Sequence, residues 1–151
     1  MGDKMKEFTG KNARIYCDYT VLLNESFELF CENNGALFKE TWTKLNIPQP
    51  VVDELKAVPM SRMDDYVLCC QGFERLNAAV EDGIAAIVEG TGYSEEFFYR
   101  LCEKSEEDII VMTNDIQLVS ELADVCAAQG RSGSFLTVLE IEENGMVHRL
   151  R

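Results

Sequence analysis

Residues 108–118 read DIIVMTNDIQL, and this stretch decides the fold. Its first half is a short continuous apolar run, which is typical of a parallel strand that is buried on both faces. Asn114 and Asp115 follow it, and the apolar residues of the next segment, residues 116–126, recur every three or four positions. The stretch therefore predicts a buried strand that passes directly into a helix, which is the repeating unit of a parallel α/β sheet.

The same unit recurs in the first half of the chain. Residues 15–23 read IYCDYTVLL and predict a buried strand that ends near Asp18. Residues 45–48 are a brief extended segment before Pro50, a residue that suits the first turn of a helix. Residues 83–88 predict a further strand. These strands alternate with helices, so we expect a sheet with helices on both faces.

The helical segments carry clear apolar periodicity. A helix beginning near residue 25 is expected to break at residues 33–35 (NNG), and a second short helix is expected to bury Phe38, Trp42 and Leu45. Residues 61–82 predict a long helix, in which apolar residues recur every three or four positions: Met63, Val67, Cys70, Phe73, Leu76 and Val80. Ser94 is expected to cap the next helix, whose first acids favour its positive end.

The ends of the chain differ in character. Residues 1–12 are polar and lack apolar periodicity, which predicts a flexible leader before a single domain over residues 13–151. Residues 134–143 alternate apolar and polar side chains, and Asn144 with Gly145 predicts a turn into a terminal hairpin.

No apolar run approaches the roughly 20 residues of a membrane span and no signal peptide is present, so we expect no membrane partner and a cytoplasmic location.

Composition narrows the function. The chain has 151 residues and a formal net charge of −13, and residues 61–151 hold 7 basic against 18 acidic residues, a difference of −11. Such a surface repels nucleic-acid backbones except at local basic spots, and it favours a basic partner or bound cations. Six cysteines without a C-x-x-C pair predict reduced, mostly buried thiols rather than a zinc site.

Acidic residues follow each of the four predicted parallel strands. Asp18 and Asp115 come directly after their strands, while Glu54 and either Glu95 or Glu96 open the following helices. Ligands of open parallel sheets bind outside the carboxyl ends of the strands, so we expect these carboxylates to form one metal-sized cluster. Clustered carboxylates suit hard divalent cations such as Mg²⁺ or Mn²⁺. Each acid also has a simpler interpretation as a helix cap or a solvated acid.

Four segments resemble the sequence blocks of PIN-domain ribonucleases, in the same order and spacing: residues 15–23, 47–55, 94–101 and 111–118. The resemblance covers about residues 13 to 140. It implies an α/β/α sandwich of three layers around a central, mostly parallel twisted sheet. It also implies Mg²⁺- or Mn²⁺-dependent hydrolysis of single-stranded RNA. The residues that it implies are the catalytic and metal-binding acids Asp18, Glu54, Glu95 and Asp115, with Thr20, Thr113, Asn114 and Glu96 in support.

The resemblance leaves two functions open. In the first, the protein is a toxin-type endoribonuclease with a basic antitoxin or a second copy of itself as partner. In the alternative, it is a catalytically degraded PIN-like domain that acts as a protein-binding module. A haloacid-dehalogenase-like phosphatase is excluded because Thr20 stands where that class needs a second aspartate.

Overall fold

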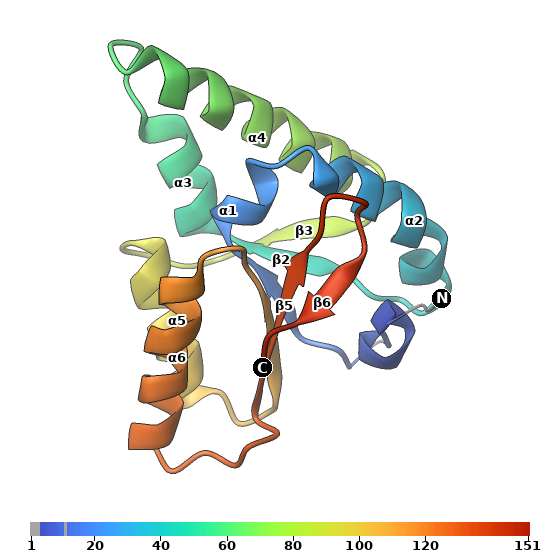
Figure 1. Cartoon of the computed structure of the whole chain (residues 1–151), viewed down its shortest axis with the longest axis vertical. Coiled ribbons are helices and arrows are strands. Elements are labelled where there is room, and N and C mark those ends of the chain that lie inside the picture. Colours follow the sequence, from blue (N-terminus) through green and yellow to red (C-terminus); the bar gives the residue numbers. More distant parts are fainter. Residues whose placement is uncertain (1–3, 11) are drawn as a thin grey trace.

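The structure, a computed structural model, describes residues 4–10 and 12–151 and is built on one six-stranded sheet (Figure 1). The strand order is β3-β2-β1-β4-β5-β6, and all neighbours are parallel except β5 and β6. The strands are β1 (Ile15–Cys17), β2 (Leu45–Pro48), β3 (Ala85–Val88), β4 (Ile109–Met112), β5 (Leu136–Ile141) and β6 (Val147–Arg149). The predicted mostly parallel sheet and terminal hairpin are confirmed.

Helices lie on two sides of this sheet and give three layers. Figure 1 shows α5 and α6 side by side below the sheet, with α1, α2 and α4 above it. The helices are α1 (Tyr19–Leu22), α2 (Ser26–Glu40), α3 (Gln49–Ala57), α4 (Met63–Glu81), α5 (Ser94–Lys104) and α6 (Ile116–Ala128). In the described ranges, no helix combines the length and the apolar character that crossing a membrane demands.

The N-terminal segment differs from the predicted flexible leader. Lys4–Phe8 form a 3-10 helix, η1, in which Met5 is buried and Phe8 packs against the core. The amide of Gly10 donates to the hydroxyl of Thr43 at 2.8 Å, which ties the segment to the body. The apolar pair at positions 5 and 8 is enough to dock one short turn. Residues 1–3 and 11 lie outside the described residues.

Helix α2 does not break at residues 33–35, contrary to expectation. The side-chain amide of buried Asn34 donates to the carbonyl of Phe30 one turn earlier, so this residue supports the helix. Gly35 is used for close packing, because a Cβ there would lie 3.4 Å from Cδ1 of Ile84. Residues 33–35, which were expected to break the helix, therefore support it and its packing instead.

The predicted second helix with Trp42 in the core is also wrong. The chain leaves α2 at Thr41, and Trp42 adopts a left-handed conformation with φ of 59° that redirects the backbone into β2. Its side chain is 82% exposed, whereas Phe38 and Leu45 on either side are buried. A residue forced into this turn conformation cannot also follow the helical periodicity that predicted its burial.

Helix α4 is confirmed, but its buried face differs from the predicted one. The large apolar residues Met63, Val67 and Val80 are exposed, while the small residues Gly72 and Ala79 are buried. A Cβ on Gly72 would lie 3.2 Å from Leu23 and 3.4 Å from the carbonyl oxygen of Leu22. Small residues let α4 approach α1 closely at Gly72, while Leu76, which the periodicity placed on the apolar face, is buried as predicted.

The hairpin turn between β5 and β6 packs against α2 and generates our first prediction. Gly145 has φ of 82°, and a Cβ there would lie 2.6 Å from Cβ of Leu29 and 2.8 Å from the backbone nitrogen of Phe30. Gly145→Ala should therefore lower the free energy of unfolding by about 1–3 kcal/mol, measured by urea denaturation. Gly133→Ala is the matched control, because nothing lies within 4 Å of that position. Equal stability of the two variants would contradict this packing role.

Candidate functional site

The carboxyl ends of the four adjacent strands β3, β2, β1 and β4 lie at one edge of the sheet. Each strand passes directly or after a short loop into a segment that carries one of the predicted acids. The structure therefore brings the segments that hold Asp18, Glu54, Glu95 and Asp115 to one edge, although 97 positions separate the first from the last.

Asp18 is the most buried of these acids, with 2% of its surface exposed. Its Oδ2 accepts hydrogen bonds from the hydroxyls of Thr20 and Thr113, both at 2.8 Å. Burial raises the pKa of Asp18 from its ordinary value of 3.8, while these hydroxyls oppose the shift because they favour the charged form. Two donors therefore hold one carboxylate oxygen in a fixed position.

The two threonines also organise the loop after β4. The Thr20 hydroxyl accepts from the amide of Asn114, and the Thr113 hydroxyl accepts from the amide of Asp115, both at 3.0 Å. Each hydroxyl thus donates to Asp18 and accepts from a backbone amide. Asn114 in turn accepts from the amide of Ile141 through Oδ1 at 3.2 Å, which links the loop to β5. The contribution of Thr20, Thr113 and Asn114 to catalysis stays a prediction.

Asp115 is the N-cap of α6. Its Oδ1 accepts from the amide of Gln117 at 3.0 Å and from the amide of Leu118 at 3.4 Å. This is the structural role that the sequence left open for this residue. Among the described residues, Oδ2 of Asp115 accepts no protein hydrogen bond.

Glu54 caps the helix that Ser94 was expected to cap. Tyr93 is the N-cap residue of α5, and Ser94 is the first helical residue. The amide and hydroxyl of Ser94 donate to the two carboxylate oxygens of Glu54 at 2.7 and 2.8 Å. A side chain from α3 therefore supplies the acceptors that a local cap supplies in most helices, a tertiary contact that no local sequence pattern could reveal.

Glu95 and Glu96 are separated by their contacts. Oε1 of Glu96 accepts from the amide of Tyr93 at 3.4 Å, so this side chain folds back on the start of its own helix. Glu95 makes no such contact within the described part of the chain, and its negative charge acts on the hydroxyls of Tyr19 and Tyr99. Of the two, Glu95 is the one whose charge reaches the site.

Tyr19 lies among the acids, although it was not predicted as a site residue. Burial raises its pKa first, and the charges of Asp18, Asp115, Glu54 and Glu95 raise it further. All four acids therefore lie close enough to act on one phenol group. Its place directly after Asp18 was the only sequence signal for this role.

The carboxylate oxygens at this edge suit a hard divalent cation as ligands, but they do not form a complete coordination shell. Within residues 4–10 and 12–151, no three His, Cys, Asp or Glu side chains gather as a metal-binding group, so the expected four-carboxylate cluster is not assembled. Asp18 accepts the two threonine hydroxyls on Oδ2, and Asp115 accepts the α6 amides on Oδ1 and keeps Oδ2 free of protein hydrogen bonds in the part of the chain described. Mg²⁺ is commonly bound by one or two carboxylates plus waters and substrate phosphates, which fits such a pair.

Comparison with solved structures identifies the fold. The chain matches the PIN domain endonuclease Utp24 with a TM-score of 0.53 and 17% sequence identity, over 94% of both chains. The chain therefore has a PIN-like α/β fold, as the resemblance implied. No protein-family model matches the sequence, and no curated protein matches it.

The raised pKa of Asp18 predicts a pH dependence of stability without metal. The folded protein holds the Asp18 proton more tightly than the unfolded chain, so stability falls as pH rises from 3.8 through the raised value. In EDTA, the free energy of unfolding of the wild type should therefore fall relative to Asp18→Asn, by up to about 1.4 kcal/mol per pH unit. Urea unfolding between about pH 4 and 7 measures this difference.

The control for this experiment is Asp124→Asn, which removes an exposed carboxylate on α6. Its stability should follow the wild type across the same range. Parallel curves for the wild type and Asp18→Asn would show that burial does not shift the titration of Asp18.

Proposed function

We propose that this protein is a cytoplasmic Mg²⁺- or Mn²⁺-dependent endoribonuclease that cleaves single-stranded RNA. The observation that carries the proposal is the pair of aspartates at the carboxyl edge of a PIN-like sheet, Asp18 held by two threonine hydroxyls and Asp115 held by a helix start. Among the described residues, Oδ2 of Asp115 has no protein donor and is available to a ligand. The six cysteines are free thiols, as expected in a reducing compartment.

The residues divide into direct and supporting groups. Asp18 and Asp115 would hold the ion, and Thr20 and Thr113 would orient the Asp18 carboxylate through its Oδ2. Glu54 and Glu95 add negative charge at the same edge, although Glu54 would have to release Ser94 before binding an ion itself. Asn114 and Glu96 act indirectly, by fixing the loop before α6 and the start of α5.

A bound divalent ion would supply an activated water and would stabilise the charge that develops on the phosphate and the leaving oxygen. The chain contributes positioning. The hydroxyl of Tyr19 is protonated at neutral pH, as for any tyrosine with a pKa at or above 10, and it would be available to donate a hydrogen bond to a phosphate oxygen. The surrounding carboxylates repel a bare phosphate, so the ion would also be needed to bring the scissile phosphate into the acidic edge itself.

A second candidate function is a PIN-like protein-binding module. The observation that favours it is the exposed apolar surface on and before α4, where Met60, Met63, Val67 and Leu68 are each more than 40% exposed. Exposed apolar side chains in one region favour a protein partner. A basic antitoxin or a second copy of the chain would cover this surface without excluding the nuclease activity.

Cleavage of RNA tests the first function directly. Purified protein with Mn²⁺ or Mg²⁺ should cleave a mixed-sequence single-stranded RNA, and EDTA should abolish the reaction. Asp18→Asn and Asp115→Asn should each lower the rate by roughly 100-fold or more, because the ion loses a charged ligand. The asparagine side chain introduced at position 115 still offers an oxygen for the helix cap, so that variant should stay folded. Gel electrophoresis of end-labelled RNA measures the rate, with Asp124→Asn as the control.

Cleavage no greater than that of the Asp18→Asn, Asp115→Asn double variant, in both ions, would refute the nuclease function and leave the binding module.

Metal binding has a readout that does not depend on activity. A ligand that binds only the folded state stabilises it by mass action, so saturating Mn²⁺ should raise the melting temperature of the wild type by roughly 5 °C or more. The shift should be much smaller in Asp18→Asn and unchanged in Asp124→Asn. Equal shifts in all three proteins, measured by differential scanning calorimetry, would place the bound ion elsewhere.

A further inference from the structure

One face of α5 and its N-cap residue carries a regular set of aromatic and basic side chains. Tyr93, Phe97, Arg100, Leu101 and Lys104 are spaced by four, three, one and three positions, so they form a single helical stripe. Phe98 and Cys102 on another face of this helix are buried in the core. Phe97 and Leu101 of the stripe are half-buried and also pack against the core, whereas Tyr93, Arg100 and Lys104 are exposed. These three exposed side chains are therefore not needed to hold α5 on the sheet.

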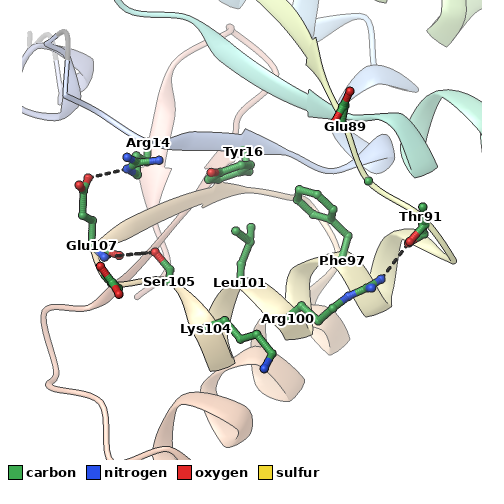
Figure 2. A pocket seen from close by; sticks show the side chains of 12 residues that line it. Arg14, Tyr16, Glu89, Thr91, Phe97, Arg100, Leu101, Lys104, Ser105 and Glu107 are labelled. Atoms are coloured by element: carbon green, nitrogen blue, oxygen red, sulfur yellow. Dashed lines mark hydrogen bonds and ion pairs between the residues drawn. The ribbon is translucent and has the colours of Figure 1, made fainter.

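This stripe borders a cavity of about 680 Å³, which is within the size range of small-ligand sites. Figure 2 shows Phe97 and Leu101 rising from α5 toward Tyr16 on β1. The rings of Tyr16 and Phe97 are tilted by 55°, with centroids 5.9 Å apart. They provide an aromatic wall against which a planar group can stack.

Basic groups lie next to this wall, and two of them are not neutralised. Arg14 is paired with Glu107. Arg100 donates to the backbone carbonyl of Thr91 at 2.8 Å, which leaves its charge without a carboxylate. Lys104 is exposed, and among the described residues neither it nor Arg100 forms an ion pair. In a protein of net charge −13, a pair of unneutralised cations one turn apart is a local attraction for phosphate.

Acidic side chains also border the cavity, and they narrow the class of ligand that it can bind. Glu89 and Glu106 are lining residues, and they supply hydrogen-bond acceptors beside the basic pair. A plain polyanion would meet repulsion from these acids. A nucleotide instead combines an anionic phosphate with a base whose ring can stack and whose amino groups can donate hydrogen bonds.

The cavity connects with the candidate active site through the loop before α5. Thr91 lines the cavity, and Ser94 bonds Glu54 at the acidic edge. Three residues of chain span at most about 10 Å. Between them stands Tyr93, whose side chain is 72% exposed, and the loop is fixed to α5 by Arg100. The loop that joins the cavity to the acidic edge thus carries an exposed aromatic residue.

We propose that Tyr93 and the α5 stripe form a binding track for single-stranded RNA, which places one nucleotide in the cavity and leads the strand to the acidic edge. A base stacks on Tyr93, a second base enters beside Phe97 and Tyr16, and Arg100 and Lys104 bind the phosphate. This inference rests on the proposed nuclease function for its substrate class. Its binding step needs no metal and can be tested separately.

The test is a binding measurement without cleavage. Fluorescence anisotropy of a labelled single-stranded oligoadenylate of ten nucleotides, in EDTA, should show binding to the wild type. Tyr93→Ala and Lys104→Gln should each weaken it about fivefold or more, the loss expected for one stacked base or one phosphate contact at low salt. Lys104→Gln should also reduce the salt dependence of the affinity by about one phosphate contact.

Matched controls exist on the opposite side of the sheet. Lys39→Gln removes an exposed lysine from the last turn of α2, as Lys104→Gln does for α5, and Trp42→Ala removes an exposed aromatic after α2. Neither should change the affinity. Equal binding by all four variants would overturn the track.

Further measurements distinguish the strand from other ligands and the track from the nuclease function. Competition by free AMP as strong as that by the RNA would overturn the assignment to a strand in favour of a free nucleotide. Equally tight binding of duplex RNA would overturn the role of base stacking. Intact cleavage with unaffected binding in Tyr93→Ala and Lys104→Gln would refute the track and keep the nuclease. Weakened binding in these variants, with no cleavage in either ion, would keep the track and refute the nuclease.

Discussion

The rest of the structure depends on the hydrogen bonds that stabilise one buried carboxylate, that of Asp18. Asp18 is placed at the end of a central strand by hydrogen bonding of its amide to the carbonyl of Met112 on β4. The hydroxyls of Thr20 and Thr113 each satisfy Oδ2 and, at the same time, a backbone amide of the next loop. Since a buried charge without partners is very costly, this network is a condition for the fold as well as a feature of the site. It couples β1, α1, β4 and the start of α6, so the geometry of the edge is set by the same contacts that hold the sheet together.

Two further acids at this edge, Asp115 and Glu54, are stabilised by helix starts, and neither forms an ion pair with a basic side chain among the described residues. Asp115 caps α6 and Glu54 caps α5 across a tertiary contact, so backbone amides carry out the neutralisation that lysine or arginine could provide. An ion pair would compete directly with a divalent cation for the carboxylate. A backbone amide instead occupies defined oxygens and leaves the net negative charge of the edge in place. The arrangement therefore keeps the acids structured in the absence of metal while preserving the field that attracts one.

Sequence predicted the parts of this architecture that follow from local pattern and topology. The apolar runs of β1 and β4 and the acids after them were predictable, because parallel strands place their carboxyl ends at one edge. Contacts between distant elements were not. Nothing near Ser94 indicates that Glu54 caps its helix, and the periodicity of α4 favoured its large apolar residues over Gly72, which is buried because α1 crosses closely there. The predicted burial of Trp42 was wrong for a related reason. The backbone turn that exposes this residue is set by the way α2 connects to β2.

The charge distribution gives a reason for separating substrate binding from the acidic edge. A site of several carboxylates attracts cations but repels the polyanionic strand, so affinity for RNA has to come from groups beyond the reach of that repulsion. The α5 stripe is such a set of groups, because Arg100 and Lys104 lie one and two turns further along the helix from Phe97. The same helix presents Glu95 at its start and cations near its end, in agreement with the polarity of its dipole. One element thus serves both demands.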